Sequence, residues 1–193
     1  NWAEFIQFAV LIYYWYRVTK RRKIMVMRRF RGESLHKVDS KGRVSIPAQF
    51  RRVLEEGDPE FKSGINPSCV LVHNQKSRKC LEGYSISSIN EVDDLVSNLP
   101  RYSREREILE RMLNAQSSYV QIDENGRLVL SNKLRELICV GSEAIFVGMG
   151  DKFQVWEPSA YKEDMEQINR DFDMFEEKDN PFNLLQSSRS LAK

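Results

Sequence analysis

The sequence has few of the residues from which catalytic and metal sites are usually built. It contains two histidines and three cysteines in 193 residues. It has no C-x-x-C pair, no phosphate-binding glycine loop, no H-E-x-x-H helix and no G-x-S-x-G turn. The cysteines lie in or beside apolar runs, where a free thiol behaves as a small hydrophobe. We therefore expect a non-enzymatic protein with reduced cysteines, no metal, no cofactor and no small-molecule substrate.

A long apolar run is also missing. The most hydrophobic stretch, Trp2 to Val18, is interrupted by Glu4, whereas a membrane-spanning helix needs about 20 apolar residues. Positive charge follows this stretch, whereas a signal peptide carries its positive charge first. We expect residues 1–26 to be an upstream extension outside the folded domain, with the true start at Met25 or Met27. A peripheral membrane-touching helix is the alternative.

The net charge is small, but it is unevenly distributed. Residues 17–52 hold thirteen Lys or Arg and two acids, whereas the stretch from Asp151 to the end holds ten acids and six bases. Removing residues 1–24, which carry five bases and one acid, changes the formal net charge from +2 to −2. Binding of a polyanion must therefore rely on a local basic patch rather than on bulk charge.

The strongest pattern is an internal duplication. Residues 39–57 recur as residues 123–141, offset by 84 residues without a gap. A period of this length indicates two copies of a small domain rather than a solenoid repeat. The identical pairs are Asp39 and Asp123, Gly42 and Gly126, Arg43 and Arg127, Arg51 and Arg135, and Gly57 and Gly141.

Each copy begins with a predicted hairpin. Short β-branched and aromatic runs flank a polar turn that contains glycine, which is typical of a β-hairpin. Asp39 and Asp123 can accept backbone N–H bonds within their own turns. Gly42 and Gly126 can supply the positive φ that such turns usually require. Loop geometry alone therefore explains these four turn-forming residues.

Each hairpin is followed by a predicted amphipathic helix, because apolar residues recur at i, i+3 and i+4. Pro47 suits its first position in one copy, and Ser131 suits the N-cap in the other. Gly57 and Gly141 are expected to end these helices in a left-handed conformation. We expect further strands at 69–72, 80–84, 144–147 and 153–156, helices opened by Ser88 and Ser103, and a helix after Pro158.

The turn arginines are the candidate functional residues. Arg43 either pairs with Asp39 across the turn or projects from it, where a guanidinium can meet phosphate or guanine through two parallel bonds. Arg127 has the equivalent position, but the second turn has Glu124-Asn125 where the first has Ser40-Lys41. The second turn is thus the weaker nucleic-acid candidate. Further candidates for phosphate contacts are Lys41, Arg31, Arg51 and Arg52.

These residues resemble the MraZ family of bacterial transcriptional regulators. The resemblance covers about residues 27–168 and is carried by Phe30-Arg31-Gly32, Asp39-Ser40-Lys41-Gly42-Arg43, Ile46-Pro47-Ala48 and the second D-x-x-x-R at 123–127. It implies an α+β, mainly β fold with two tandem AbrB-like (SpoVT-AbrB) domains, each a small swapped-hairpin or double-psi-like β-barrel. The expected division is domain 1 at 30–86, a helical connector at 87–114, domain 2 at 115–160, and a helix with a disordered acidic tail at 161–193.

The resemblance also implies a function. It suggests a cytoplasmic, nucleoid-associated protein that binds double-stranded DNA at repeated sites upstream of its own division and cell wall operon, usually as a repressor. It implies a homo-oligomeric ring. The DNA-contacting arginine of the family maps onto Arg43, with Lys41 beside it, and Arg127 matches the same motif. An AbrB-like antitoxin and a membrane-associated DNA-binding scaffold are the alternatives.

Overall fold

The fold of this computed structural model is α+β and contains antiparallel β-sheets; residues 29–62, 65–73 and 79–173 are described. The first copy contains β1 (Glu33–Lys37), β2 (Arg43–Ser45), α2 (Ala48–Glu56), β3 (Ser68–Val72) and β4 (Cys80–Ser85). Two helices follow, α3 (Ile86–Ser97) and α4 (Arg104–Leu113). The second copy contains β5 (Ser117–Gln121), β6 (Arg127–Val129), α5 (Asn132–Leu137), β7 (Glu143–Gly148) and β8 (Lys152–Trp156), and α6 (Pro158–Asp173) comes last. The expected extension at 1–26 and the tail from 174 lie outside the described residues.

The strands of the two copies are interleaved. One sheet has the order β1-β7-β8-β4-β3-β5, and a second, two-stranded sheet pairs β2 with β6. In the large sheet, β1, β3 and β4 of the first copy correspond to β5, β7 and β8 of the second. Exchanging each strand for its counterpart gives the order β5-β3-β4-β8-β7-β1, which is the same order read from the other edge of the sheet. The two copies are therefore related by an approximate twofold axis, which passes between β4 and β8 and between β2 and β6.

This arrangement does not confirm two separate barrels at 30–86 and 115–160. β1 of the first copy pairs with β7 of the second copy, and β5 of the second copy pairs with β3 of the first. The two strands of each predicted hairpin do not pair with each other in one sheet, because β1 and β5 belong to the large sheet and β2 and β6 to the small one. A unit of about fifty residues buries too little apolar surface to be robust alone, and interleaving gives both copies one shared core.

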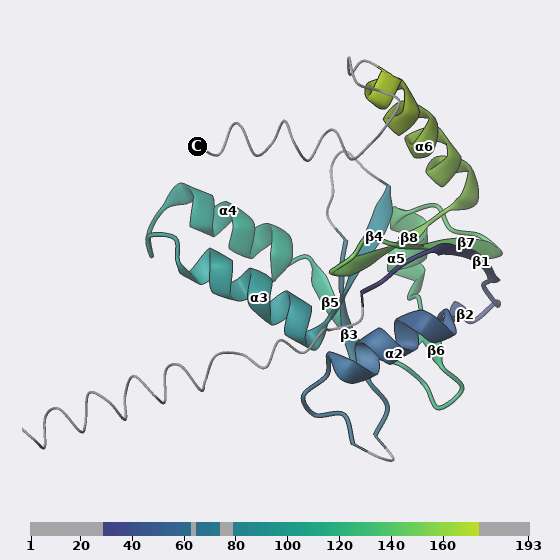
Figure 1. Cartoon of the computed structure of the whole chain (residues 1–193), viewed down its shortest axis with the longest axis horizontal. Helices are drawn as coiled ribbons and strands as arrows, with labels where there is room; N and C mark the ends of the chain where they lie inside the picture. The colour runs from purple at the N-terminus through teal and green to yellow at the C-terminus, as the bar shows by residue number, and fades with distance from the viewer. Residues whose placement is uncertain (1–28, 63–64, 74–78, 174–193) are drawn as a thin grey trace, which may run out of the picture.

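The shared core lies between the large sheet and the segments that carry the two turns. Phe50 of α2 contacts Phe30, Phe146 and Phe153, with ring centroids 5.3, 6.4 and 5.7 Å away. Val44 and Leu128 are fully buried beneath the two-stranded sheet. In Figure 1, α2, β2 and β6 occupy one end of the molecule, and the α3–α4 hairpin occupies the other. The two turns are thus attached directly to the shared core.

The predicted N-caps at Ser131 and Ser103 are confirmed. Ser131 accepts the N–H of Leu134, and Ser103 accepts the N–H of Arg106. The helix expected to open at Ser88 begins one turn earlier, because Ser85 is its N-cap and accepts the N–H of Ser88.

The expected left-handed glycine caps are wrong. Gly57 has φ −91°, and the left-handed residue after α5 is Cys139, with φ 57°. Gly57 packs instead against Ser85, where a Cβ would lie 2.6 Å from the serine Cβ. The absence of a side chain at Gly57 is thus required by close packing rather than by backbone conformation.

The shared core predicts a large difference between two glycine-to-alanine substitutions. A Cβ on Gly83 of β4 would fall within the ring of Phe153 of β8, in the other copy, whereas a Cβ on Gly141 would meet nothing within 4 Å. Overpacking a core costs about 1–3 kcal/mol, so Gly83→Ala should lower the free energy of unfolding by that amount. Gly141→Ala should change it by less than about 0.5 kcal/mol. Urea denaturation of the two variants measures this, and equal losses would contradict the packing of copy against copy.

Candidate nucleic-acid interface

The first turn is closed by its own aspartate. The Asp39 carboxylate accepts the backbone N–H groups of Lys41 and Arg43, both at 2.9 Å. The Gly42 N–H donates to the Asp39 carbonyl at 2.9 Å, and Gly42 has φ +79°. A residue with a side chain adopts this conformation only at a cost, so Asp39 and Gly42 are both required by the shape of the turn.

The second turn repeats this geometry. The Asp123 carboxylate accepts the N–H groups of Asn125 and Arg127, both at 2.9 Å, and Gly126 has φ +72°. The predicted role of both aspartates as acceptors in their own turns is confirmed. The turns thus present the same backbone shape, and they differ in the side chains at their tips.

The two turns are locked together by reciprocal backbone bonds. The Leu130 N–H donates to the Gly42 carbonyl at 2.8 Å, and the Ile46 N–H donates to the Gly126 carbonyl at 3.1 Å. These bonds flank the β2–β6 ladder, in which Val44 lies opposite Leu128. Each turn is therefore hydrogen-bonded to the strand end of the other copy.

The ladder brings Arg43 and Arg127 to one surface. Arg43 lies opposite Val129, and Arg127 lies opposite Ser45. Residues directly opposite in an antiparallel ladder point to the same face, and alternate residues along a strand do as well. Because Val44 and Leu128 point into the core, both arginines lie on the outer face. The duplication thus places two equivalent arginines on the same outer face, each held by the aspartate of its own turn.

Both arginines form ion pairs within their turns. An Arg43 Nη2–Asp39 Oδ2 contact measures 2.6 Å, and an Arg127 Nε–Asp123 Oδ2 contact measures 2.7 Å. The expected salt bridge is therefore present in both turns. It orients each guanidinium without covering it, because 37% of the Arg43 side chain and 31% of the Arg127 side chain remain exposed. The planar group is held in place and can still meet a phosphate or a base edge.

The aspartates remain charged over a wider pH range than usual. The backbone N–H of Arg43 lowers the pKa of Asp39 below its ordinary value, its guanidinium and the Lys41 N–H add to this effect, and desolvation opposes it. At Asp123 desolvation acts to raise the pKa, but the N–H groups and the guanidinium of the turn outweigh it, so this pKa is also lowered. Both turns are therefore in their paired, charged form at neutral pH.

The other predicted residues do not all lie at this surface. Lys41 is exposed at the tip of the first turn. Arg31 is exposed but precedes β1, so it lies at the end of that strand away from the turn. Arg51 is half-buried and packs against Gly126 of the second turn. The equivalent Arg135 packs against Gly42 of the first turn, and sequence reasoning gave it no role although it was the partner of Arg51 in the duplication.

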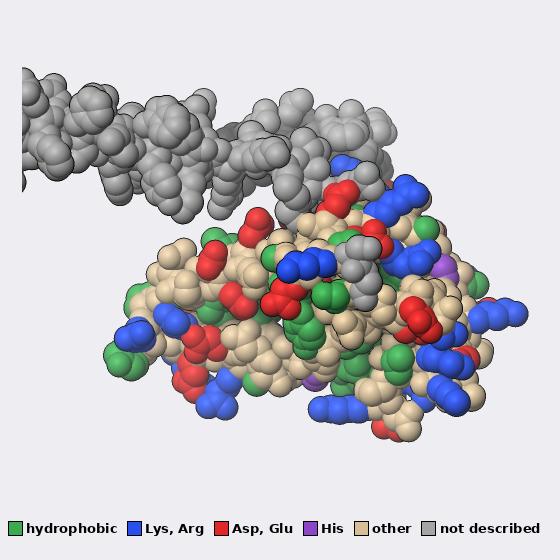
Figure 2. All heavy atoms as spheres, turned by 90° about the horizontal axis from the view of Figure 1, so that it is seen from below, with side chains coloured by type: hydrophobic (Ala, Val, Ile, Leu, Met, Phe, Trp, Pro, Cys, Tyr) green, Lys and Arg blue, Asp and Glu red, His purple; other side chains and the backbone are tan. Residues whose placement is uncertain are grey.

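Charge is distributed unevenly over the surface. In Figure 2, Lys and Arg side chains predominate over the end that carries α2, β2 and β6, whereas both signs mix over the α3–α4 end. The turn arginines thus lie within the more basic end of the described surface. A surface of this kind favours a polyanion that extends beyond the two turns.

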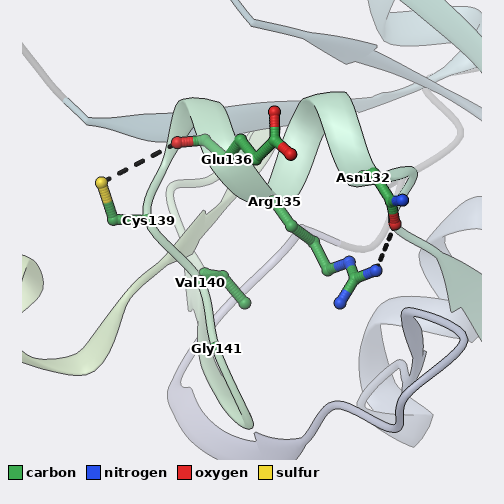
Figure 3. A pocket seen from close by; sticks show the side chains of 6 residues that line it. All are labelled: Asn132, Arg135, Glu136, Cys139, Val140 and Gly141. Carbon is green, nitrogen blue, oxygen red and sulfur yellow. Dashed lines mark hydrogen bonds between the residues drawn. The ribbon is translucent and has the colours of Figure 1, made fainter.

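A pocket of about 400 Å³ lies beside α5 (Figure 3). It is lined by Asn132, Arg135, Glu136, Cys139, Val140 and Gly141.

Across residues 29–62, 65–73 and 79–173, no three His, Cys, Asp or Glu side chains are grouped as metal ligands. None of the helices in this part of the chain has the length and apolarity needed to cross a bilayer.

The chain matches known proteins over most of its length. Residues 29–87 and 113–183 match the family model described as "MraZ protein, putative antitoxin-like". The protein of Ruegeria pomeroyi named "Transcriptional regulator MraZ" is 51% identical over 154 residues, which are 76% of this chain and 92% of that one. Proteins of the same name from Cereibacter sphaeroides and Parvibaculum lavamentivorans are 42% and 38% identical, over 68% and 70% of this chain and 82% and 80% of theirs.

The contacts of the turn glycines predict unequal costs for the same substitution. A Cβ on Gly42 would overlap the backbone carbonyl oxygen of Leu130, whereas a Cβ on Gly126 would meet the side chain of Arg51, which can move. A left-handed conformation costs about 1–2 kcal/mol for a residue with a side chain, so Gly126→Ala should lose about that amount. Gly42→Ala should lose about 2–5 kcal/mol, since overpacking adds about 1–3 kcal/mol. Chemical denaturation measures both, and the reverse order would show that the turns are not held as described.

The lowered pKa of Asp39 predicts the pH dependence of its contribution to stability. A carboxyl whose pKa is lower in the folded state stabilises the fold above its unfolded pKa, which is about 4. That contribution is lost as the pH falls from this value through the lower folded pKa. The wild type should therefore be more stable than Asp39→Asn at pH 7, and the difference should shrink below pH ~4. Urea titrations of both proteins between pH ~3 and ~7 measure it. A difference that grows on acidification would contradict the assignment.

Proposed function

The chain belongs to the MraZ family, and we propose that it is a DNA-binding transcriptional regulator that reads double-stranded DNA with its two arginine turns. The observation that carries this proposal is the common outer face of β2 and β6, which carries both Arg43 and Arg127, each oriented by an aspartate. The name of its relatives, transcriptional regulator, supports the same function. No step of this function requires a cofactor or a catalytic residue.

The first turn is the principal reader in this proposal. It carries Lys41 at its exposed tip, whereas the second turn carries Glu124, which repels phosphate. Arg43 can meet a guanine edge or a phosphate with two parallel bonds, and Lys41 can meet a neighbouring phosphate as a point charge. Arg127 adds a weaker contact from the second turn. Arg31, at the far end of β1, would meet DNA only if the duplex extended along that strand.

We further propose that several copies of the chain act together. The formal net charge is only +2, so a single chain attracts DNA weakly outside the turns. Several chains in a homo-oligomeric ring would bind repeated sites at once, and linked contacts raise the overall affinity without any new interaction. The expected targets are repeated sites upstream of its own division and cell wall operon, with repression as the outcome, in the cytoplasm and at the nucleoid.

An antitoxin-like role is the second candidate, because the matching family model carries that description. It would require a small protein partner in addition to DNA. Co-purification of a stable small partner that is lost when residues 174–193 are removed would favour this role, whereas a full-length chain that purifies alone would favour the regulator.

The proposal predicts a selective effect of Arg43→Ala. Loss of one bidentate base contact costs about 1–3 kcal/mol, so the affinity for the duplex upstream of its own operon should fall about 5- to 150-fold. Arg127→Ala should cost less. Arg104→Ala, on the exposed surface of α4, is the matched control and should bind like the wild type.

Fluorescence anisotropy with labelled duplex gives the affinity, and size-exclusion chromatography shows whether assembly is intact. An Arg43→Ala variant with wild-type affinity and an unchanged elution volume would overturn the proposed function.

A further inference from the structure

Each turn is supported from below by an arginine of the other copy. Arg135 of α5 lies beneath the first turn, where its Nε is 3.2 Å from the place that a Cβ on Gly42 would occupy. Arg51 of α2 lies beneath the second turn, where its Cδ and Cζ are both 2.7 Å from the corresponding place at Gly126. Each turn therefore packs against the guanidinium group of an arginine that belongs to the other copy.

These two arginines are half-buried, with their Nε atoms turned into the protein. The Nε atoms of both Arg51 and Arg135 are buried, and within the described residues neither has a hydrogen-bond partner. An unpaired buried N–H is costly, so its presence at both equivalent positions requires an explanation. The explanation is steric: the flat guanidinium fits beneath a glycine that has no side chain. A lysine has the same charge but no plane, and it cannot fill this space in the same way.

The support of the first turn is the better fixed of the two. Arg135 donates from Nη2 to the Oδ1 of Asn132, one turn earlier on α5 (Figure 3). The position equivalent to Asn132 in the first copy is Ala48, which has no side-chain acceptor for Arg51. The tethered arginine thus lies beneath the turn that carries Lys41 and Arg43. In Figure 3 its side chain projects from α5 away from Cys139.

We propose that Arg135 is a positioning residue, which holds the first turn in the shape that binds DNA without contacting DNA itself. This inference rests on the proposed function and assigns the second copy an indirect role in it. Ordering a residue on binding weakens affinity, and a turn that is already ordered in the free protein avoids that cost. Asn132 acts one step further back, by fixing the orientation of Arg135.

Arg135→Lys distinguishes positioning of the turn from direct contact with DNA, because it keeps the positive charge and removes the planar guanidinium group. We expect about tenfold weaker binding, the cost of ordering about one residue when the complex forms. The dependence of affinity on salt should not change, since no phosphate contact is lost. Hydrogen exchange in the segment 39–43 should be faster in the free variant. Asn132→Ala should show the same changes to a smaller extent.

Lys133→Ala is the matched control, since it removes an exposed charge from the same helix without touching the turn. It should leave exchange in 39–43 unchanged. Affinity is measured by anisotropy with a labelled duplex of the sequence directly upstream of the coding sequence, at several salt concentrations. Exchange is measured on the full chain by mass spectrometry, and circular dichroism shows that each variant is folded. If Arg135→Lys does not fold, Asn132→Ala carries the test.

Two outcomes overturn the inference. A reduction of the salt dependence by about one phosphate contact in Arg135→Lys would show that Arg135 meets DNA directly. Unchanged affinity and unchanged exchange in both variants would show that the turn needs no support. The proposed function fails differently, because then the wild type does not bind the duplex at all. Faster exchange in Arg135→Lys would in that case still establish support of the turn and would overturn only its role in DNA binding.

Discussion

Reciprocal backbone hydrogen bonds join the turns of the two copies. Leu130 donates to the carbonyl of Gly42, and Ile46 donates to the carbonyl of Gly126, so each copy completes the turn of the other. Neither bond can form within one copy. The same exchange recurs where β1 pairs with β7 and β5 with β3. The chain is therefore a single interlocked unit, and the arginine surface exists only because both copies are present.

This constraint explains how a nearly neutral chain can present the proposed DNA-binding surface. Asp39 uses its carboxylate both to close the turn and to orient Arg43, and Asp123 does the same for Arg127. The proposed DNA contacts thus depend on the fixed positions of these two arginines rather than on a large net positive charge. The residues at the tips of the turns then distinguish the two copies. Lys41 makes the first turn attractive to phosphate, and Glu124 makes the second less so.

The sequence predicted features that depend on neighbouring residues along the chain. The aspartate-closed turns, the positive φ of Gly42 and the caps at Ser103 and Ser131 follow from local hydrogen bonding. It did not predict which strands pair, because alternation specifies the face of a strand and not its partner. The contact of Arg135 with the first turn was also missed. Its identity with Arg51 across the duplication was a signal, but only the structure shows that each arginine packs against the turn of the other copy.

Amide hydrogen exchange of Ile46 and Leu130 in the free, full-length protein tests the interlocked turns most directly. If the two copies form one cooperative unit, both amides exchange only when the whole domain opens, at the rate of core amides such as Phe146 and Phe153. Both should then also become faster together in a variant that destabilises the shared core. Fast exchange of Ile46 and Leu130 while the core amides remain protected would show that the turns open independently, and it would contradict this account.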